Sequence, residues 1–397
     1  MKENILFVMP SLSAGGGEKS LVNLLSQIDY NRFNIDLFLF NHNGIFMEYL
    51  PSEVNVLSLP DTYTDFTLPL HKSIAKFIMK RKFNLVLSRI TYTKMNRSSK
   101  STSINEQYSW KYMAQSLEKL EKKYDIAIGF LEKTSTYFCV DKVEANKKIG
   151  WVHIDYDKLG MDPQYDLPYF KKLDNIITVS EECSNILKER FPSEGEKVQV
   201  IYNIVSPTTI TKMAKMEKVD NPQKNNEVNI LSIGRLHYQK GFDRAIKACK
   251  IMVDKGYNIQ WRIIGEGEER QKLMTLINEY NLKDHFHLIG LKSNPYPYIK
   301  NAEVYAQTSN FEGKSIAIDE AKILQKPILV TNFSTAKDQI QHGKNGLIVE
   351  MDPSAIADGI ENLIIDKDLR KKLTTNLANE KLGTEAEINK LYELFAR

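Results

Sequence analysis

Short apolar runs alternate with helix-like stretches along most of the chain. The first run, NILFVMP at residues 4–10, ends at Pro10. A Ser/Gly-rich loop, the helical spacing of SLVNLLSQI and a second apolar run, NIDLFLF at 34–40, follow it. Strand, glycine-rich loop, helix and strand in this order predict a parallel α/β sheet.

The alternation continues through the first half with one interruption. Further strands are predicted at 125–131, at the start of 147–155 and at 198–203, and the segment 175–191 predicts a strand, an N-cap at Ser180 and a helix. Between them, residues 61–105 look irregular and basic, with some helical character at 72–82. The spacing of WKYMAQSLEKLEKKY predicts an amphipathic helix over 110–124.

The alternation restarts in the second half. Residues 206–227 are polar, Lys-rich and contain Pro207 and Pro222, so we expect a hinge or linker at about 203–227. Five strands then alternate with helices: VNILSIG, IQWRIIG, FHLIG, EVYAQTS and PILVT. We therefore expect two tandem doubly wound domains, 1–204 and 205–380, with a ligand cleft between them. A C-terminal helix at 381–397 should pack back on the first domain.

Length and composition fit this organisation. A chain of 397 residues is too long for one core, and its 42% hydrophobic and 26% charged residues are ordinary for a soluble protein. The three cysteines lie far apart, which argues against a disulfide framework or a zinc site. No run of about 18 apolar residues is present, and the N-terminal ILFVM is too short for a signal peptide. These features predict a cytoplasmic protein.

The net charge of +4 is unevenly distributed. Between Phe66 and Asn105 the chain has no acidic residue and nine basic ones: Lys72, Lys76, Lys80, Arg81, Lys82, Arg89, Lys94, Arg97 and Lys100. We expect the 72–100 region to bind an anionic membrane surface. Nucleic acid and an ordinary solvated face are the alternatives, and we expect no nucleic-acid partner.

Three loops carry candidate chemistry at strand ends. Gly15 and Gly16 in SAGGGE allow close backbone approach to an anion, although the spacing is not that of a dinucleotide fingerprint and a simple turn is the alternative. In GRLHYQKG, Arg235 and Lys240 suit a diphosphate, or are surface charges. His153 follows an apolar strand at the edge of the expected cleft, where binding residues gather, or is structural.

The stretch NFEGKSIAIDEA, residues 310–321, sets two carboxylates around a predicted helix start at Ser315. Glu312 precedes the helix and Glu320 lies in its second turn. The amides of Lys314, Ser315 and Ile316 form an expected anion site. Because carboxylates accept hydrogen bonds from sugar hydroxyls, this layout predicts a nucleotide sugar as ligand.

Taken in order, these motifs resemble those of the retaining glycosyltransferases of family 4, of the bacterial cell-surface polysaccharide type. GGGE matches the family's G-G-x-E loop, GRLHYQKG its G-R-L then K-G element, and EGKSIAIDEA its two glutamates separated by seven residues. The resemblance implies the GT-B fold: two tandem Rossmann-like doubly wound domains that face each other across a cleft. The sequence departs from the family at Gly17 and in Gly313-Lys314-Ser315, where Lys314 replaces a hydrophobic residue.

The resemblance also implies roles for the matching residues. Arg235 and Lys240 would bind the donor diphosphate, Glu312 the transferred sugar, Glu320 the ribose, and His153 would lie beside donor sugar and acceptor. The implied catalytic set is His153, Arg235, Lys240 and Glu312, and the donor-binding set is Gly15, Gly16, Gly234, Lys314, Ser315, Ile316 and Glu320. No metal or other cofactor is expected, because the two cations and the helix dipole replace it; an Asp155/Asp157 metal triplet is the lesser alternative.

We therefore predict a transferase that moves a hexose or N-acetylhexosamine from a UDP-sugar to a lipid-linked glycan in cell-surface polysaccharide synthesis. It would act at the inner face of the plasma membrane, as a peripheral protein. Two alternatives share the same architecture. One is an epimerase acting on a UDP-sugar, and the other is a non-catalytic nucleotide-sugar-binding subunit of a transferase complex.

Overall fold

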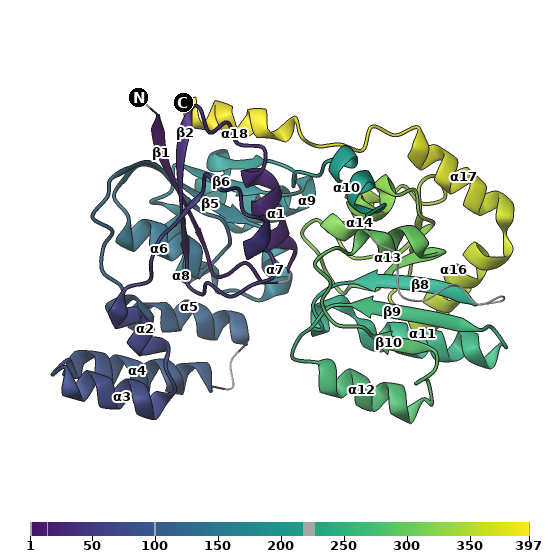
Figure 1. The fold of residues 1–397 in the computed structure, drawn as a ribbon, viewed down its shortest axis with the longest axis horizontal. Helices are drawn as coiled ribbons and strands as arrows, with labels where there is room; N and C mark the ends of the chain where they lie inside the picture. Colours follow the sequence, from purple (N-terminus) through teal and green to yellow (C-terminus); the bar gives the residue numbers. More distant parts are fainter. Residues whose placement is uncertain (1, 14, 99–100, 217–226, 397) are drawn as a thin grey trace. The chain divides into compact units, whose positions relative to one another are not determined.

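The computed structural model describes residues 2–13, 15–98, 101–216 and 227–396 (Figure 1). The chain forms two compact units. The first comprises Met1–Ser13, Leu24–Ile201 and Lys390–Arg397, and the second comprises Ala14–Asn23 and Tyr202–Asn389. Each unit is built around one parallel β-sheet with helices on both faces, so the predicted α/β class is confirmed.

In the described part of the first unit, the sheet has seven strands in the order β3-β2-β1-β4-β5-β6-β7. They are β1 (Glu3–Met9), β2 (Phe33–Leu39), β3 (Asn55–Val56), β4 (Tyr124–Gly129), β5 (Ala145–Val152), β6 (Asn175–Thr178) and β7 (Val198–Val200). The central strands are buried on both faces, which explains why they stand out in the sequence as continuous apolar runs.

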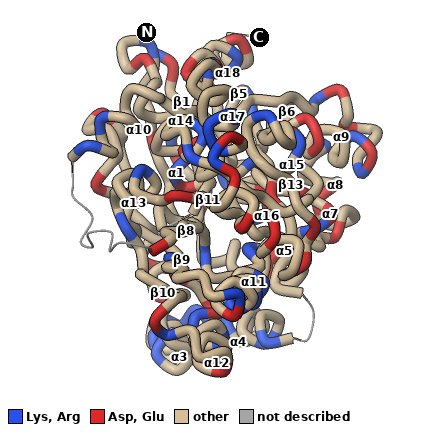
Figure 2. The backbone as a smooth tube through the Cα atoms, turned by 90° about the vertical axis from the view of Figure 1, so that its right-hand side faces the viewer, with Lys and Arg blue, Asp and Glu red and all other residues tan. Residues whose placement is uncertain are grey.

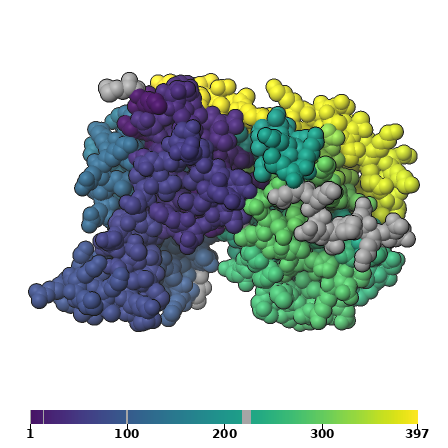
Figure 3. All heavy atoms as spheres, viewed as in Figure 1, coloured from purple at the N-terminus to yellow at the C-terminus, as the bar shows by residue number. Residues whose placement is uncertain are grey.

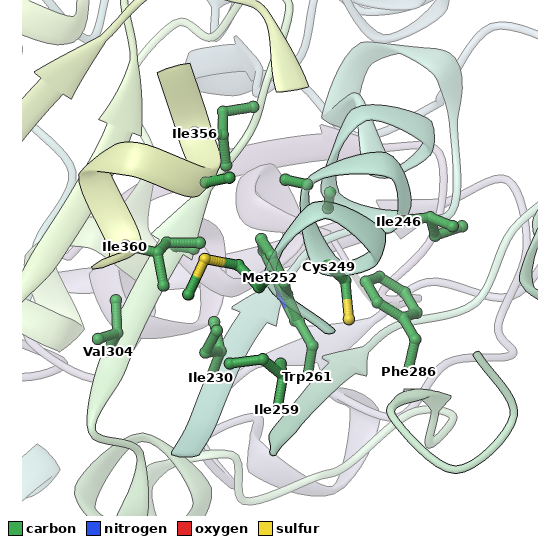
Figure 4. Close-up of a cluster of buried hydrophobic side chains, with 14 of the residues drawn as sticks. Ile230, Ile246, Cys249, Met252, Ile259, Trp261, Phe286, Val304, Ile356 and Ile360 are labelled. Carbon is green, nitrogen blue, oxygen red and sulfur yellow. The ribbon is translucent and has the colours of Figure 1, made fainter. Parts of the chain in front are cut away.

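The second unit has a six-stranded sheet in its described residues, in the order β10-β9-β8-β11-β12-β13. The strands are β8 (Val228–Ile233), β9 (Ile259–Ile264), β10 (Phe286–Leu288), β11 (Val304–Gln307), β12 (Ile328–Thr331) and β13 (Leu347–Val349). Cys249 and Met252 from helix α11 pack with Ile356 and Ile360 from α16 against Trp261 of the sheet (Figure 4). This buried cluster fixes the sheet whose strand ends carry most of the predicted site.

The α-helices surround these sheets. Those of the N-terminal half are α1 (Gly16–Leu25), α2 (Asp61–Thr67), α3 (Leu70–Met79), α4 (Phe83–Asn96), α5 (Thr102–Met113), α6 (Thr134–Lys142), α7 (Tyr156–Leu159), α8 (Pro163–Phe170) and α9 (Glu181–Arg190). Those of the C-terminal half are α10 (Pro207–Met213), α11 (Phe242–Asp254), α12 (Arg270–Glu279), α13 (Tyr296–Asn301), α14 (Ile316–Ile323), α15 (Ala336–Gln339), α16 (Pro353–Ile365), α17 (Lys367–Ala378) and α18 (Glu387–Ala396). No helix of the described residues combines the length and apolar character that crossing a membrane requires.

The helical character predicted at 72–82 is confirmed by α3, but the irregular structure predicted for the rest of 61–105 and the helix predicted at 110–124 were wrong. The first segment is largely helical, since α2, α3, α4 and the start of α5 occupy its described residues, and Pro60 and Pro69 are the N-caps of α2 and α3. In the second, α5 ends at Met113, and the chain reaches β4 through a short 3₁₀ turn and a loop. Leu117 and Leu120 produce the helix-like spacing there, but both pack on the core from that loop.

The predicted linker at 203–227 also differs from the structure. Residues 207–213 form α10, and Ile210 is buried with Val205 and Ala214 in a core of the second unit, so this part is not a flexible connection. Pro222 and the rest of 217–226 lie outside the described residues. At the C-terminus, α18 begins at Glu387, and its last residues belong to the first unit.

Candidate functional site

Most of the predicted site residues lie in the second unit, past the carboxyl ends of two adjacent strands. Gly234, Arg235 and Lys240 follow β8, and Glu312 follows β11, which pairs directly with β8. In a parallel sheet, such strand ends are where ligands bind. Gly234 and Glu312, which are 78 positions apart in the sequence, are therefore brought to one edge of the sheet.

Lys240 and Glu312 form the centre of this site. The Glu312 carboxylate is only 5% exposed. Its Oε1 accepts hydrogen bonds from Lys240 Nζ at 2.5 Å, Ser309 Oγ at 2.6 Å and Gln307 Nε2 at 2.8 Å. In contrast, Oε2 receives one longer bond within the described structure, from Gln239 Nε2 at 3.3 Å. The carboxylate is thus held firmly through one oxygen, while the other keeps accepting capacity.

Sequence reasoning missed these supporting partners of Glu312. Gln307 and Ser309 belong to no motif, but the run of polar residues that directly follows the buried β11 marks this strand end as unusual. Such a polar run after an apolar strand is the signal that could have identified them.

The loop after β8 is tied to the loop after β11. Gly241 has φ +60°, and a Cβ at this position would lie 2.2 Å from the carbonyl oxygen of Thr308, so only glycine fits without a backbone shift. In return, Thr308 Oγ1 donates to the carbonyl oxygen of Lys240 at 3.0 Å. This close approach fixes the backbone of Lys240 beside the segment that carries Glu312.

The N-terminus of α14 is partly occupied by the protein itself. The Ser315 amide, predicted to bind an anion, donates to Gln339 Oε1 at 2.8 Å, and Gln339 Nε2 donates back to the Ser315 carbonyl oxygen at 2.8 Å. The Ser315 amide, one of the three amides of the predicted anion site, therefore already donates to a side chain that the sequence did not identify. Lys314 lies with its Nζ 4.0 Å from the centre of the Tyr202 ring, a cation–π contact.

Glu320 lies in a second ion pair, with Lys19 from the glycine-rich segment. Glu320 is 1% exposed, and its Oε1 contacts Lys19 Nζ and accepts from the Tyr296 hydroxyl at 3.1 Å. Lys19 also lies over the Tyr296 ring, 4.5 Å from its centre. Lys19 is a contact residue that the motif G-G-x-E does not include.

The same glycine-rich segment contacts Arg235. Glu18 Oε1 lies 3.5 Å from an Arg235 guanidinium nitrogen. A Cβ at Gly15 would lie 2.0 Å from Glu18 Oε2, whereas one at Gly16 would meet no atom within 4 Å. The lack of a side chain at Gly15 thus makes room for the Glu18 side chain. At Gly16, the position that a Cβ would occupy is open.

His153 is the predicted site residue that belongs to the first unit, directly after β5. Its backbone amide donates to Glu132 Oε2 at 3.2 Å, and its ring packs between Phe130 and Trp151. Burial lowers the pKa of His153 from 6.5 to about 3, so the imidazole is neutral at neutral pH. Its enclosed Nε2 has no hydrogen-bond partner among the described residues.

The Asp155/Asp157 triplet has structural partners. Asp155 caps α7 by accepting from the Lys158 amide at 3.1 Å, and Asp157 accepts from Arg190 at 2.9 and 2.8 Å. In the part of the chain that the structure describes, no three His, Cys, Asp or Glu side chains are grouped as a metal site.

Comparison with known proteins finds a family match in the second half. Residues 214–380 match the family described as "Glycosyl transferases group 1". Over 205 residues the chain is 29% identical to the N-acetylgalactosamine-N,N'-diacetylbacillosaminyl-diphospho-undecaprenol 4-alpha-N-acetylgalactosaminyltransferase of Campylobacter jejuni, covering 51% of this chain and 54% of that relative. Over 168 residues it is 32% identical to the capsular polysaccharide biosynthesis glycosyltransferase CapM of Staphylococcus aureus, covering 41% and 43%.

These matches span about half the length of the two relatives, whereas the fold matches over the whole chain. A crystal structure of S. aureus TarM, in complex with fondaparinux, alpha-GlcNAc-glycerol and UDP, aligns with a TM-score of 0.69 at 16% identity and covers 100% of both chains. At this identity the likeness concerns the fold, and it confirms the predicted architecture of two Rossmann-like units.

Proposed function

We propose a specific sugar transfer, on the premise that residues 214–380 match the group 1 glycosyltransferases and that the chain has the GT-B fold. The protein moves a hexose or N-acetylhexosamine from a UDP-sugar to a lipid-linked glycan, with retention of anomeric configuration and without a metal ion. Two comparisons support this choice: the TarM structure holds UDP, and the C. jejuni relative is named for a diphospho-undecaprenol-linked acceptor.

The observation that carries the proposal is the buried Lys240–Glu312 pair past the ends of β8 and β11. Negative charge grows on the diphosphate as its bond to the sugar breaks. Lys240, already oriented by Glu312, and Arg235 on the same loop offset this charge without reorganisation, which is the most effective form of electrostatic stabilisation. The less occupied Oε2 of Glu312 accepts hydrogen bonds from the sugar hydroxyls.

The ribose of the donor binds to the Glu320 carboxylate in the same way, through an oxygen that still accepts hydrogen bonds. Lys19 and Tyr296 both contact Oε1 of this carboxylate, so Oε2 is the oxygen that takes the ribose hydroxyl. The anion site at the start of α14 then uses the Lys314 and Ile316 amides, because the Ser315 amide is held by Gln339.

Retention follows from departure and attack on the same face of the sugar. The bond between the anomeric carbon and the diphosphate oxygen breaks, the acceptor oxygen forms the new bond, and the acceptor proton passes to the leaving diphosphate. Glu312 is engaged by three donors through Oε1 and binds hydroxyls instead of attacking the anomeric carbon.

The test is UDP release and product analysis with a panel of UDP-sugars and lipid-linked acceptors. We expect Lys240→Ala and Glu312→Gln to lower turnover by about 100-fold or more, as when one charge-stabilising group is removed. Lys283→Ala and Glu279→Ala, exposed residues near α12, serve as matched controls and should keep full turnover.

Each alternative gives a distinct result. A converted UDP-sugar without acceptor would show an epimerase, and UDP binding without turnover of any donor would show a non-catalytic subunit. Full turnover in both site variants would refute the site assignment. The anomeric configuration of the product, read by NMR coupling, tests retention separately.

A further inference from the structure

Helices α3 and α4 carry a concentrated exposed apolar surface in the first unit. Among the described residues, ten large hydrophobic side chains are exposed, and half of them lie between positions 78 and 90: Ile78, Met79, Phe83, Leu87 and Ile90. Met79 is 80% exposed, Phe83 65% and Leu87 68%. We call these five residues the α3–α4 surface; such clustering marks an interaction site, whereas scattered exposed residues do not.

The surface has a regular geometry on α4. Phe83, Leu87 and Ile90 follow the spacing of one helix face, about 3.6 residues a turn. The opposite face is buried through Leu85 and Ser88, and Leu85 packs with Phe66 and Phe77 in a small separate core. In Figure 1 the pair α3–α4 lies on the outer side of the first unit, with α2 and α5 towards the sheet. Helix α4 therefore packs on its own small core through the opposite face, and the exposed stripe is not an uncovered part of the main core.

The apolar stripe continues into basic residues. Lys94 and Arg97 continue the same face of α4, and Lys80, Arg81 and Lys82 form the turn between the two helices. Lys72, Arg81, Lys82, Lys94 and Arg97 make no ion pair with any described residue. In Figure 2, blue Lys and Arg segments are visible around α3 and α4.

The nine basic residues of this region are not equivalent. Lys76 and Lys80 both pair with the buried Asp65, at 2.6 and 2.5 Å. Arg89 turns inward, where it donates to the Leu68 carbonyl oxygen at 3.0 Å and lies over the Phe66 ring. Lys100 lies outside the described residues. The basic positions that remain without an acidic partner are those beside the apolar stripe.

We propose that the α3–α4 surface inserts into the interface of a bilayer that contains anionic phospholipid. Its apolar side chains enter the boundary between headgroups and acyl chains, and Arg81, Lys82, Lys94 and Arg97 contact the phosphates. Charge complementarity favours this occupant, since the whole segment from Phe66 to Asn105 has no acidic residue. Around 80, the chain also forms the outermost surface at one end of the first unit (Figure 3).

This inference goes beyond electrostatic attraction and is independent of the donor chemistry. A purely electrostatic surface releases the membrane when salt screens it. A surface that also inserts Phe83 and Leu87 retains part of its binding in salt, because burial of apolar area is not screened. The two modes therefore differ in a measurable way.

The test is co-sedimentation of the full-length protein with vesicles of phosphatidylcholine alone or mixed with phosphatidylglycerol. We expect binding to the mixed vesicles, with part of it retained in high salt. The double variant Phe83→Ser/Leu87→Ser should lower the partition coefficient about 10-fold or more. Lys94→Gln/Arg97→Gln should lower it about 30-fold at low salt, with a weaker salt dependence. The controls are Met274→Ser, exposed on α12, and Lys283→Gln.

Insertion is read directly with Phe83→Trp. The three native tryptophans, Trp110, Trp151 and Trp261, are buried, so a new exposed indole dominates the change on vesicle addition. We expect a blue shift and quenching by brominated acyl chains. Unchanged emission, or equal vesicle binding by all variants, would overturn the proposal. A dimer in sedimentation experiments without vesicles would also overturn it, if the variant Phe83→Ser/Leu87→Ser dissociates that dimer. The surface would then serve self-association.

Discussion

At the scale of single residues, the surroundings of a predicted site residue set its charge state. His153 is the clearest case, because burial against Phe130 and Trp151 lowers its pKa to about 3. A neutral imidazole whose enclosed Nε2 has no partner among the residues that the structure describes can exchange a hydrogen bond with a neutral hydroxyl, and it does not bring a positive charge to it.

The low pKa of His153 has a consequence for stability. The unfolded chain binds a proton at this side chain below about pH 6.5, while the folded protein does so only near pH 3. Between these values the unfolded state holds more protons, so the free energy of unfolding falls as the pH falls. We expect His153→Gln to reduce the loss of stability between pH 7 and pH 5, measured by urea unfolding. A wild-type slope in His153→Gln would show that His153 is protonated when folded.

The sequence identifies the charged centres of the site better than their partners. Glu312, Glu320, Arg235 and Lys240 stand in recognisable spacings after strand ends, and the structure brings each into a defined contact. The partners Lys19 and Gln339 could not be predicted, because each contacts the site residues from a distant part of the sequence. Gln307 and Ser309 are marked only by the polar run at the end of the apolar β11. Their hydrogen bonds exist only once the fold is formed.

At the scale of elements, α14 is held in place by the short helix α15. The Gln339 side chain of α15 bonds both the amide and the carbonyl of Ser315 and donates to Asp319 Oδ1 at 3.0 Å. Gln339 is buried, so water cannot readily replace these bonds when the side chain is shortened. The N-terminus of α14, where the anion site is proposed, is therefore positioned by a neighbour and not only by its own residues.

Gln339→Ala should destabilise the protein by about 1–3 kcal/mol, because it leaves buried polar groups without partners. It should also weaken UDP binding, since the start of α14 loses its support. Thermal unfolding and calorimetric titration with UDP measure the two effects. The matched control Gln341→Ala removes an exposed side chain and should change neither. Unchanged UDP affinity in a destabilised Gln339→Ala would limit Gln339 to a role in folding.

Sequence patterns predict the elements unevenly, and the reason is burial. Most of the strands were predicted, because both faces of a parallel sheet are covered, which favours continuous apolar residues. The short strands β3 and β13 were not predicted. Helices α3 and α4 were not recognised as a pair, because their buried faces are narrow and their outer faces mix apolar and basic residues. The feature that obscured these helices in the sequence is the one that we assign to membrane contact.

At the scale of the whole molecule, the first unit is completed by the far end of the chain. Leu391, Leu394 and Phe395 of α18 are buried in it. The rings of Tyr392 and Phe395 each lie 5.4 Å from the Phe33 ring, and the Tyr392 hydroxyl accepts from the Asp29 amide at 2.8 Å. The start of β2 and the turn before it thus depend on residues more than 350 positions away.

This dependence predicts a selective loss of stability. Phe395→Ala should destabilise the first unit by about 3 kcal/mol, the cost of removing a large buried side chain. Hydrogen exchange should rise around residues 29–39 and stay unchanged in β8 and β11, because Phe395 belongs to the first unit, where its ring packs on Phe33 and Tyr392. Glu393→Ala on the same helix is the control and should leave exchange unaltered in both units. Equal exchange increases in both units would instead mean that α18 couples them into one cooperative structure, since local destabilisation then spreads through a shared unfolding step.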